Sequence, residues 1–333
     1  MRTSRTLSIV AGTAAIVLAS LTVAAPASAA TIASGQKITV IDLIQAEVGP
    51  TGSRFFDVDP ANAAVTAVGN VQAPDTVYGL DVNDEGVGYA IAFYSEDSEN
   101  PGEPQSWVPV LLTADAKNGT LGDFVDIVPT VEITINLCTG IDLQPNGEII
   151  VACLDLRDGL LNSYIGVVTP EGAFTPFISS GENDVEEYDY TALAFNGVTG
   201  ELWAFAFIGE NDDEPAAFLL NRAAGTQGPP IALTEDVYGA DFDRNGQLFV
   251  SSYDDATDVE TLAATVDLAT GVVTVVGPYS EDLFVESLTV WGKPALAATG
   301  SPVDALPAGL GAALLLLAGA AFIATQRISR KAA

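Results

Sequence analysis

The sequence predicts an all-β fold, a five-bladed β-propeller that lies between an N-terminal signal peptide and a C-terminal transmembrane helix. The first observation is a short segment that recurs five times at starts 47 to 61 residues apart, a period typical of propellers and solenoids. Each repeat also contains four short apolar runs separated by turn residues, and the middle of the chain keeps no helical periodicity. The five copies are residues 78–82, 139–143, 191–195, 238–242 and 286–290.

Each repeat is expected to form one four-stranded blade. The recurring segment is the first strand, and a turn rich in Asn and Gly follows it, because these residues adopt positive φ in hairpins. A strongly apolar second strand such as 202–207 precedes a long polar loop, a third strand, a turn such as 269–271 and a fourth strand such as 272–276. The predicted first turns are residues 83–86, 145–148, 196–200 and 244–247.

The fifth repeat ends after its first strand, at Trp291. Three further strand-like segments stand near the N-terminus, at residues 37–43, 53–59 and 64–69. We therefore expect one blade to contain both chain ends, which closes the ring and removes an exposed sheet edge. The alternative is an irregular pair of β-sandwiches.

The repeats show a hydrophobic-D-x-x-G-x-hydrophobic rhythm and a D-x-A-T-G turn at residues 267–271. In these features they resemble NHL and YVTN-like β-propeller repeats. The resemblance covers residues 37–291. It implies a propeller fold and no family-specific active site.

The N-terminal residues 1–30 have the features of a secretory signal peptide. Arg2 and Arg5 precede an apolar run, and an A-x-A site predicts cleavage after Ala29 or Ala30. A retained membrane anchor is the alternative, but the apolar run is shorter than the ~20 residues that a span needs. We therefore expect an extracellular propeller ectodomain at residues 31–294.

The C-terminus combines an apolar span with a short motif. Residues 305–325 carry no charge and are long enough to cross a membrane, and the basic tail 326–333 is expected on the cytoplasmic side. A pentapeptide stands upstream in the linker 295–304. Its residues are Leu296, Ala297, Ala298, Thr299 and Gly300.

Motif, span and basic tail in this order resemble a Gram-positive sorting signal of the LAxTG type, which class E sortases read. The resemblance implies sortase as a partner, cleavage between Thr299 and Gly300, and attachment of Thr299 to cell-wall peptidoglycan. The membrane helix then serves only before sorting. The alternative is a permanent transmembrane anchor with the ectodomain outside.

The composition excludes several kinds of function. The chain has 44 Asp and Glu against 12 Lys and Arg, a formal net charge of −32, and no His. Without His, Ser-His-Asp and Cys-His catalysis and His-ligated zinc or haem sites are excluded. The acidity opposes binding to nucleic acid and favours cationic partners or divalent cations.

The acidic residues cluster in the long loops, which propeller topology places on one face. We interpret this acidic face as a site for calcium or a cationic partner, because hard cations prefer several carboxylate oxygens. A solvated, self-repelling surface is the alternative. The residues that represent the acidic face are Glu96, Asp97, Asp184, Asp212, Asp213, Asp254 and Asp255.

A calcium loop is a weaker hypothesis. The segment 241–246 matches the opening D-x-D-x-N-G, but Ser252 stands at the twelfth position, where a bidentate Glu is needed. Two further Asp residues recur at the repeat position of Asp241, which favours a shared structural role such as bonding the following turn. The candidate calcium ligands are Asp241, Asp243, Asn245, Asp81 and Asp142.

Cys138 and Cys153 flank the predicted hairpin turn of the second repeat. A four-residue turn at 144–147 places them opposite each other on paired strands, so an exported chain is expected to join them in a disulfide. Free thiols in a reducing compartment are the alternative.

The sequence therefore predicts an exported, surface-displayed, non-catalytic propeller that binds a partner or forms part of the wall. The alternative is a calcium-dependent hydrolase or lactonase that uses carboxylates near the channel entrance, where we expect Asp189, Asp236 and Glu286. A pair of carboxylates with different pKa values can act as acid and base.

Overall fold

The computed structural model describes residues 31–44, 52–72, 77–96, 106–155, 162–180, 188–208, 214–253, 261–279, 283 and 285–293. The predicted signal peptide, the sorting motif 296–300 and the apolar span 305–325 lie outside these residues. In the ranges that the structure describes, no helix is long and apolar enough to cross a membrane.

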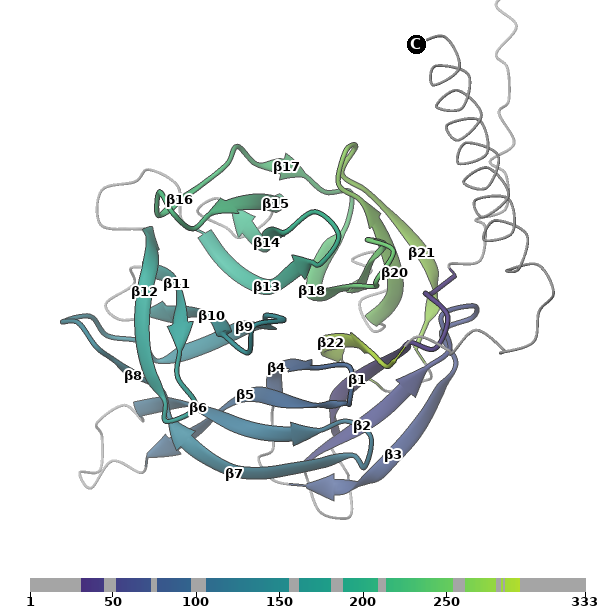
Figure 1. Cartoon of the computed structure of the whole chain (residues 1–333), viewed down its shortest axis with the longest axis horizontal. Helices are drawn as coiled ribbons and strands as arrows, with labels where there is room; N and C mark the ends of the chain where they lie inside the picture. The colour runs from purple at the N-terminus through teal and green to yellow at the C-terminus, as the bar shows by residue number, and fades with distance from the viewer. Residues whose placement is uncertain are drawn as a thin grey trace, which may run out of the picture.

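Five β-sheets surround a central axis and form a five-bladed β-propeller (Figure 1). In every blade the first strand named lies next to the axis, and the others follow outwards.

Blade 1 consists of β4 (Val77–Val82), β5 (Val87–Glu96), β6 (Ser106–Asp115) and β7 (Thr120–Asp126). Blade 2 consists of β9 (Leu137–Leu143), β10 (Ile149–Asp155), β11 (Asn162–Val168) and β12 (Ala173–Ser180), with β8 (Val128–Pro129) parallel to β12. Blade 3 consists of β13 (Tyr188–Asn196), β14 (Glu201–Ile208), β15 (Glu214–Asn221), β16 (Thr226–Gln227) and β17 (Ile231–Ala232). Blade 4 consists of β18 (Asp236–Phe242), β19 (Leu248–Tyr253), β20 (Thr261–Asp267) and β21 (Val272–Pro278). Blade 5 consists of β22 (Val285–Trp291), β1 (Lys37–Ile44), β2 (Gly52–Val58) and β3 (Val65–Gln72).

The predicted closure is confirmed, because β22 from the C-terminal side pairs antiparallel with β1 from the N-terminal side. The register runs from Lys37 opposite Trp291 to Ile41 opposite Ser287. The ring is therefore closed, and the strands that form its five blades all lie between residues 31 and 293.

Blade 3 departs from the predicted pattern of four regular strands. Its outer edge is split into β16 and β17, which both pair with β15. Gly228, Pro229 and Pro230 separate these two pieces. Since Pro has no backbone N–H to donate, a continuous fourth strand cannot form here.

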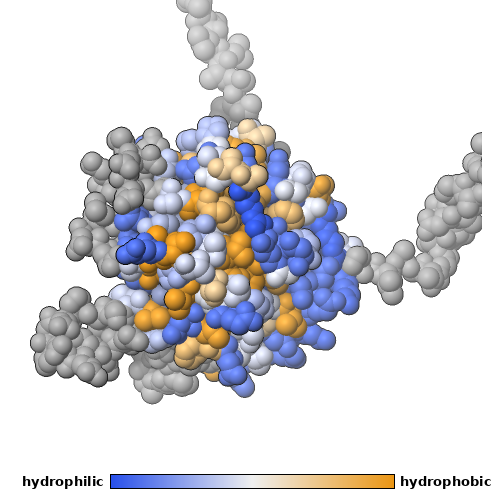
Figure 2. Space-filling model, turned by 60° about the vertical axis from the view of Figure 1, so that its left-hand side comes forward, coloured by the Kyte–Doolittle hydropathy of each residue, from blue (hydrophilic) through white to orange (hydrophobic). Residues whose placement is uncertain are grey.

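Hydrophobic side chains fill each interface between neighbouring blades, so the core has five separate clusters. For example, Phe205 of blade 3 packs with Val237 and Val250 of blade 4. On the side of the ring in Figure 2, hydrophobic residues form small patches among hydrophilic ones. The hydrophobic core therefore lies between neighbouring blades and not in the central channel.

The disulfide between Cys138 and Cys153 is confirmed. The two residues face each other on β9 and β10, but the route differs from the prediction. Leu143 pairs with Ile149, so the hairpin loop has one residue more than expected, and a β-bulge beside Cys138 restores the alignment. Both cysteines are buried.

Candidate functional site

The ring has two different faces. Short turns join the first and second strands of blades 1 to 4 at one end, which we call the narrow-turn face. The inner strands begin at the opposite end, which we call the loop face. Of the predicted acidic face, Glu96 ends β5 at the loop face. The other residues of that prediction, Asp97, Asp184, Asp212, Asp213, Asp254 and Asp255, lie outside the described residues.

Every inner strand carries a β-bulge at the same repeat position. In β4, Val77 and Gly79 pair with consecutive residues of β5, and the residue between them is left out of the ladder. The same slip occurs in the other four inner strands. The five residues left out are Tyr78, Thr139, Thr191, Tyr238 and Glu286, and we call them the bulge ring. All five line the channel. Because a bulge re-aims its side chain, this repeated feature brings five side chains to one level.

The residue after each bulge is small because the inner strands approach closely. A Cβ on Gly79 would lie 2.9 Å from Ile141 Cγ2, and a Cβ on Gly239 would lie 2.8 Å from the amide nitrogen of Leu288. The channel is consequently narrow beside the bulge ring, with a void of about 10 Å³. The bulge ring therefore lines a narrow part of the channel, near the loop-face end of the inner strands.

The members of the bulge ring differ in chemistry. The Thr139 hydroxyl donates to the carbonyl of Tyr190, and the Thr191 hydroxyl donates to the carbonyl of Val237 at 2.5 Å. These two threonines join neighbouring blades. Tyr78, Tyr238 and Glu286 instead bring two phenols and a carboxyl group to the channel.

Glu286 is a partly buried acid with a pKa near neutral pH. Burial, together with the nearby charge of Asp42 on β1, raises its pKa to about 7. Burial and the charge of Glu286 raise the pKa of Tyr78 to about 12. Asp189 and Asp236, the other predicted entrance residues, begin their inner strands at the same face. All three acids therefore lie at the end of the channel where they were expected.

Aromatic side chains extend outward from the ring. Tyr78 stacks on Phe93 with 5.1 Å between centroids, and Phe93 meets Trp107 edge to face at 4.4 Å. Trp107 is 46% exposed. On the opposite side, Tyr238 contacts Phe207 and Tyr253. The loop-face end of the channel thus combines aromatic rings with acidic residues.

Near the narrow-turn face, the candidate calcium ligands Asp81, Asp142 and Asp241 bond neighbouring blades. Asp81 Oδ2 accepts the amide of Leu143 at 2.5 Å, and Asp142 Oδ1 accepts that of Phe195 at 2.7 Å. Asp241 Oδ2 accepts the amide of Val290 at 2.6 Å.

We call Asp81, Asp142 and Asp241 the inter-blade latch. Thr289 of blade 5 adds to it, since its hydroxyl accepts the amide of Val82 at 3.3 Å and donates to Asp81 at 2.9 Å. Ala194 holds the equivalent position in blade 3 and offers no side-chain acceptor. The amide of Phe242 is bonded instead by Asp241 of its own strand. The repeated Asp thus shares a structural role, but that role is the joining of blades and not the expected bonding of the following turn. Of the three, Asp142 also accepts a hydrogen bond from the following turn, from Gln144 Nε2 at 2.6 Å.

Burial raises the pKa of all three latch carboxyls, and the charge of a neighbouring carboxyl raises those of Asp81 and Asp241 further. The pKa of Asp81 rises to about 8 and that of Asp142 to about 6, with burial the largest cause in both cases. Burial and the charge of Asp81 raise the pKa of Asp241 well above its usual range. The latch therefore holds protons at a pH where ordinary carboxyl groups are ionised.

Asp243 and Asn245 belong to the turn after β18. Asp243 Oδ1 accepts the amides of Asn245 at 2.9 Å and Gln247 at 2.8 Å, and Asp243 Oδ2 accepts that of Ala33 at 2.9 Å. Among the described residues, no three His, Cys, Asp or Glu side chains gather in a way that could hold a metal ion. Calcium binding stays a prediction.

A cavity of about 660 Å³ opens on the narrow-turn face. Its lining includes the three latch carboxyls together with Asp243 and Arg244. Hydrogen bonds to backbone amides already engage these carboxyls, so the cavity floor is primarily a structural joint.

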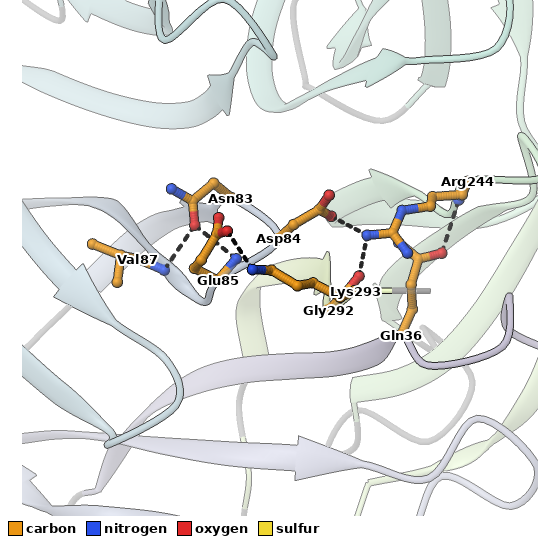
Figure 3. Close-up of polar contacts among 8 residues, drawn as sticks. All are labelled: Gln36, Asn83, Asp84, Glu85, Val87, Arg244, Gly292 and Lys293. Carbon is orange, nitrogen blue, oxygen red and sulfur yellow. Dashed lines mark hydrogen bonds and ion pairs between the residues drawn. The ribbon is translucent and has the colours of Figure 1, made fainter. Parts of the chain in front are cut away.

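The C-terminal end of the propeller is clamped at the rim of this cavity (Figure 3). Arg244 in the blade 4 turn donates to the carbonyl of Gly292 and pairs with Asp84 of the blade 1 turn at 2.5 Å. Lys293 pairs with Glu85 at 2.8 Å. The amide of Arg244 donates to Gln36 Oε1 at 2.9 Å, so the segment that precedes β1 also contacts this turn. The chain therefore leaves the ring at the narrow-turn face, held by two turns.

Three features were not identified from the sequence. They are the bulge ring, the aromatic row formed by Tyr78, Phe93 and Trp107, and the clamp formed by Arg244 and Lys293 with the turns of blades 4 and 1. The repeat alignment begins at the bulge residue in all five copies, and that position combines Tyr, Thr and Glu before a small residue. This pattern was the available signal. It could not be interpreted without the strand pairing that leaves the residue out of the ladder.

No protein-family model and no curated protein matches the chain. Among solved structures, a protein of unknown function from Dyadobacter fermentans is 9% identical with a TM-score of 0.49, over 72% of this chain and 80% of that one. The periplasmic gluconolactonase of Pseudomonas aeruginosa is 13% identical with a TM-score of 0.39, over 73% and 82%. A protein from Lactobacillus plantarum is 10% identical with a TM-score of 0.37, over 77% and 99%. Nothing about the function of this chain follows from likenesses this weak.

Proposed function

We propose that the chain is an exported, wall-anchored, non-catalytic β-propeller that presents its loop face outward as a binding surface. The observation that carries this proposal is the clamp, because it fixes the place where the chain leaves the propeller toward the sorting motif. Arg244 and Lys293 hold the exit of the chain against the turns of blades 4 and 1, on the narrow-turn face.

The tether is short. Only residues 292–295 separate Trp291 from the LAxTG-type motif, and each residue spans at most ~3.5 Å. Attachment at Thr299 would hold the narrow-turn face toward the wall. The bulge ring and its aromatic surroundings would then face away from it, where a partner can approach.

Wall attachment is tested with the full chain in a Gram-positive host that has a class E sortase. We expect muralytic digestion to release protein ending at Thr299 and joined to peptidoglycan fragments, and Thr299→Ala to abolish this product. Ala298→Ser is the matched control, because the motif leaves that position open. Intact protein in the detergent fraction, still carrying residues 326–333, would show a permanent membrane anchor instead.

A hydrolase is the second candidate function, and one observation favours it. Burial and the nearby charge of Asp42 raise the pKa of Glu286 to about 7, so this carboxyl can act as a general acid or base near neutral pH. The non-catalytic proposal expects no turnover by residues 31–299 on a panel of glycans, esters and lactones, with or without calcium. Turnover that Glu286→Gln abolishes would establish the hydrolase.

A further inference from the structure

We propose that the bulge ring binds a primary ammonium group, carried by a lysine side chain of a basic peptide or by a polyamine. This proposal deepens the binding function proposed above and rests on it. It concerns the loop face only, so it does not depend on how the chain is anchored.

Charge complementarity is the first argument. The five inner strands contain six acidic residues and no Lys or Arg. Three of those acids, Asp189, Asp236 and Glu286, stand in the loop-face half of their strands. Asp42 on β1 acts electrostatically on Glu286, and Arg54 is the cation opposite Asp42 in register. The mouth of the channel therefore attracts cations and repels anions.

Size is the second argument. The void beside the ring measures about 10 Å³, which is the space that one water molecule needs. A primary ammonium head is about as large as a water molecule, whereas a quaternary ammonium group is several times larger. The ring therefore selects a small cationic head.

A buried hydroxyl gives the third argument. Ser287 is 2% exposed, lines the same void, and its Oγ has no hydrogen-bond partner within the part of the chain that the structure describes. A buried hydroxyl without a partner is costly. An ammonium group has three donors, so it can bond Ser287 Oγ and the neighbouring Glu286 carboxylate together.

The aromatic row accounts for the stem of the ligand. Tyr78, Phe93 and Trp107 lead from the ring to an exposed surface. Methylene groups of a lysine or polyamine pack well on aromatic rings, and the rings also attract the adjacent positive charge. The row therefore distinguishes an organic amine from a metal ion of equal charge.

Binding should depend on pH through Glu286. Tyr78 from β4 and Asp42 from β1 act on this group, Arg54 of β2 lies opposite Asp42, and Tyr238 of β18 shares the ring. An ammonium group favours the ionised carboxyl, so the complex forms with loss of a proton below the pKa of about 7. Affinity should fall as pH falls from 8 to 6 across that pKa.

The test is calorimetric titration of residues 31–299 with n-butylammonium, spermidine and a trilysine peptide. Tetramethylammonium and Mg²⁺ serve as controls for head size and for charge alone. We expect the primary amines to bind and both controls to fail. Spermidine and trilysine compared with each other distinguish the two sources of the amine.

Variants complete the test. Glu286→Gln should weaken binding by at least about tenfold at pH 8 and remove its pH dependence. Ser287→Ala and Tyr78→Leu should weaken it several-fold, while Tyr78→Phe keeps the ring and retains binding. Glu214→Gln is the matched control, since it removes an exposed loop-face charge at the start of β15, outside the ring.

Three outcomes would overturn the proposal: no binding of any amine, equal binding of tetramethylammonium, or equal losses from Glu286→Gln and Glu214→Gln. The selectivity of the unmodified protein decides the matter even where a variant fails to fold. Because wall attachment is measured separately in cells, failure of amine binding and failure of anchoring can be told apart.

Discussion

Asp81 connects three blades through one buried side chain. Its carboxyl accepts the amide of Leu143 in blade 2, the hydroxyl of Thr289 in blade 5 and the amide of its own neighbour Val82. The sequence showed that Asp recurs at this position. It could not show the partner, because the bonded amide lies 62 residues away and is brought close only by the ring.

The latch predicts that stability falls as pH rises. The pKa of Asp81 is raised from 3.8 to about 8, that of Asp142 to about 6 and that of Glu286 to about 7, so between pH 4 and pH 8 the folded protein keeps protons that the unfolded chain loses. By linkage, the free energy of unfolding decreases across this window. Urea denaturation should give a higher midpoint at pH 5 than at pH 8.5, and Asp81→Asn should flatten the difference. A midpoint that rises with pH would contradict the raised pKa values.

The bulge ring shows why the residues that line the channel were only partly predictable. Glu286 was expected near the channel entrance, and the structure confirms that placement. Tyr78 and Tyr238 were visible only as members of a repeat. Their exposure to the channel depends on a register shift in each hairpin, which is a property of two paired strands and not of one segment.

At the scale of elements, the closing strand β22 packs on the turn of blade 1. Gly86 has a φ of 80°, and a Cβ there would lie 2.8 Å from the Trp291 ring. Gly147 has a similar φ of 85° in the blade 2 turn, with nothing within 4 Å of its Cβ position.

This pair predicts that Gly86→Ala destabilises the fold by about 1–3 kcal/mol more than Gly147→Ala, because both share the φ strain but only Gly86 also overlaps a buried ring. The free energy of unfolding from urea titration measures the difference. Equal losses would mean that Trp291 does not seat on this turn.

The disulfide supports the hairpin of β9 and β10. Cys138 and Cys153 close a loop with a sequence separation of 15, which corresponds to about 3 kcal/mol in the loop-entropy model. Replacing both cysteines with Ala should lower the free energy of unfolding by roughly that amount, and reducing agent should then have no further effect. An unchanged free energy of unfolding would show that the hairpin does not depend on the bond.

The number of blades and the order of their strands were predictable because turns and apolar runs recur along the chain. The details that differed have local causes. Pro229 and Pro230 divide the outer edge of blade 3, and a five-residue hairpin loop with a bulge replaces the expected four-residue turn in blade 2. Proline is visible in the sequence, but the loop length is decided by pairing across the hairpin.

At the scale of the whole molecule, closure by both chain ends was predictable from a strand count. Which loops lie on which face was also predictable, because the loop between the second and third strands of a blade lies at the end where its inner strand begins. The clamp was not, because Arg244, Asp84 and Lys293 come from three separate segments that meet only in the closed ring. The proposed orientation of the molecule depends on that contact.

The most direct test of this orientation is thiol labelling on intact cells that express the full chain. Glu214→Cys places a thiol on the exposed loop-face start of β15, and Val198→Cys places one on the narrow-turn face, where Val198 is 61% exposed. A bulky, membrane-impermeant thiol reagent should label Glu214→Cys on intact cells and Val198→Cys only after muralytic digestion of the wall. Labelling of Val198→Cys on intact cells, with Glu214→Cys protected, would contradict the outward loop face.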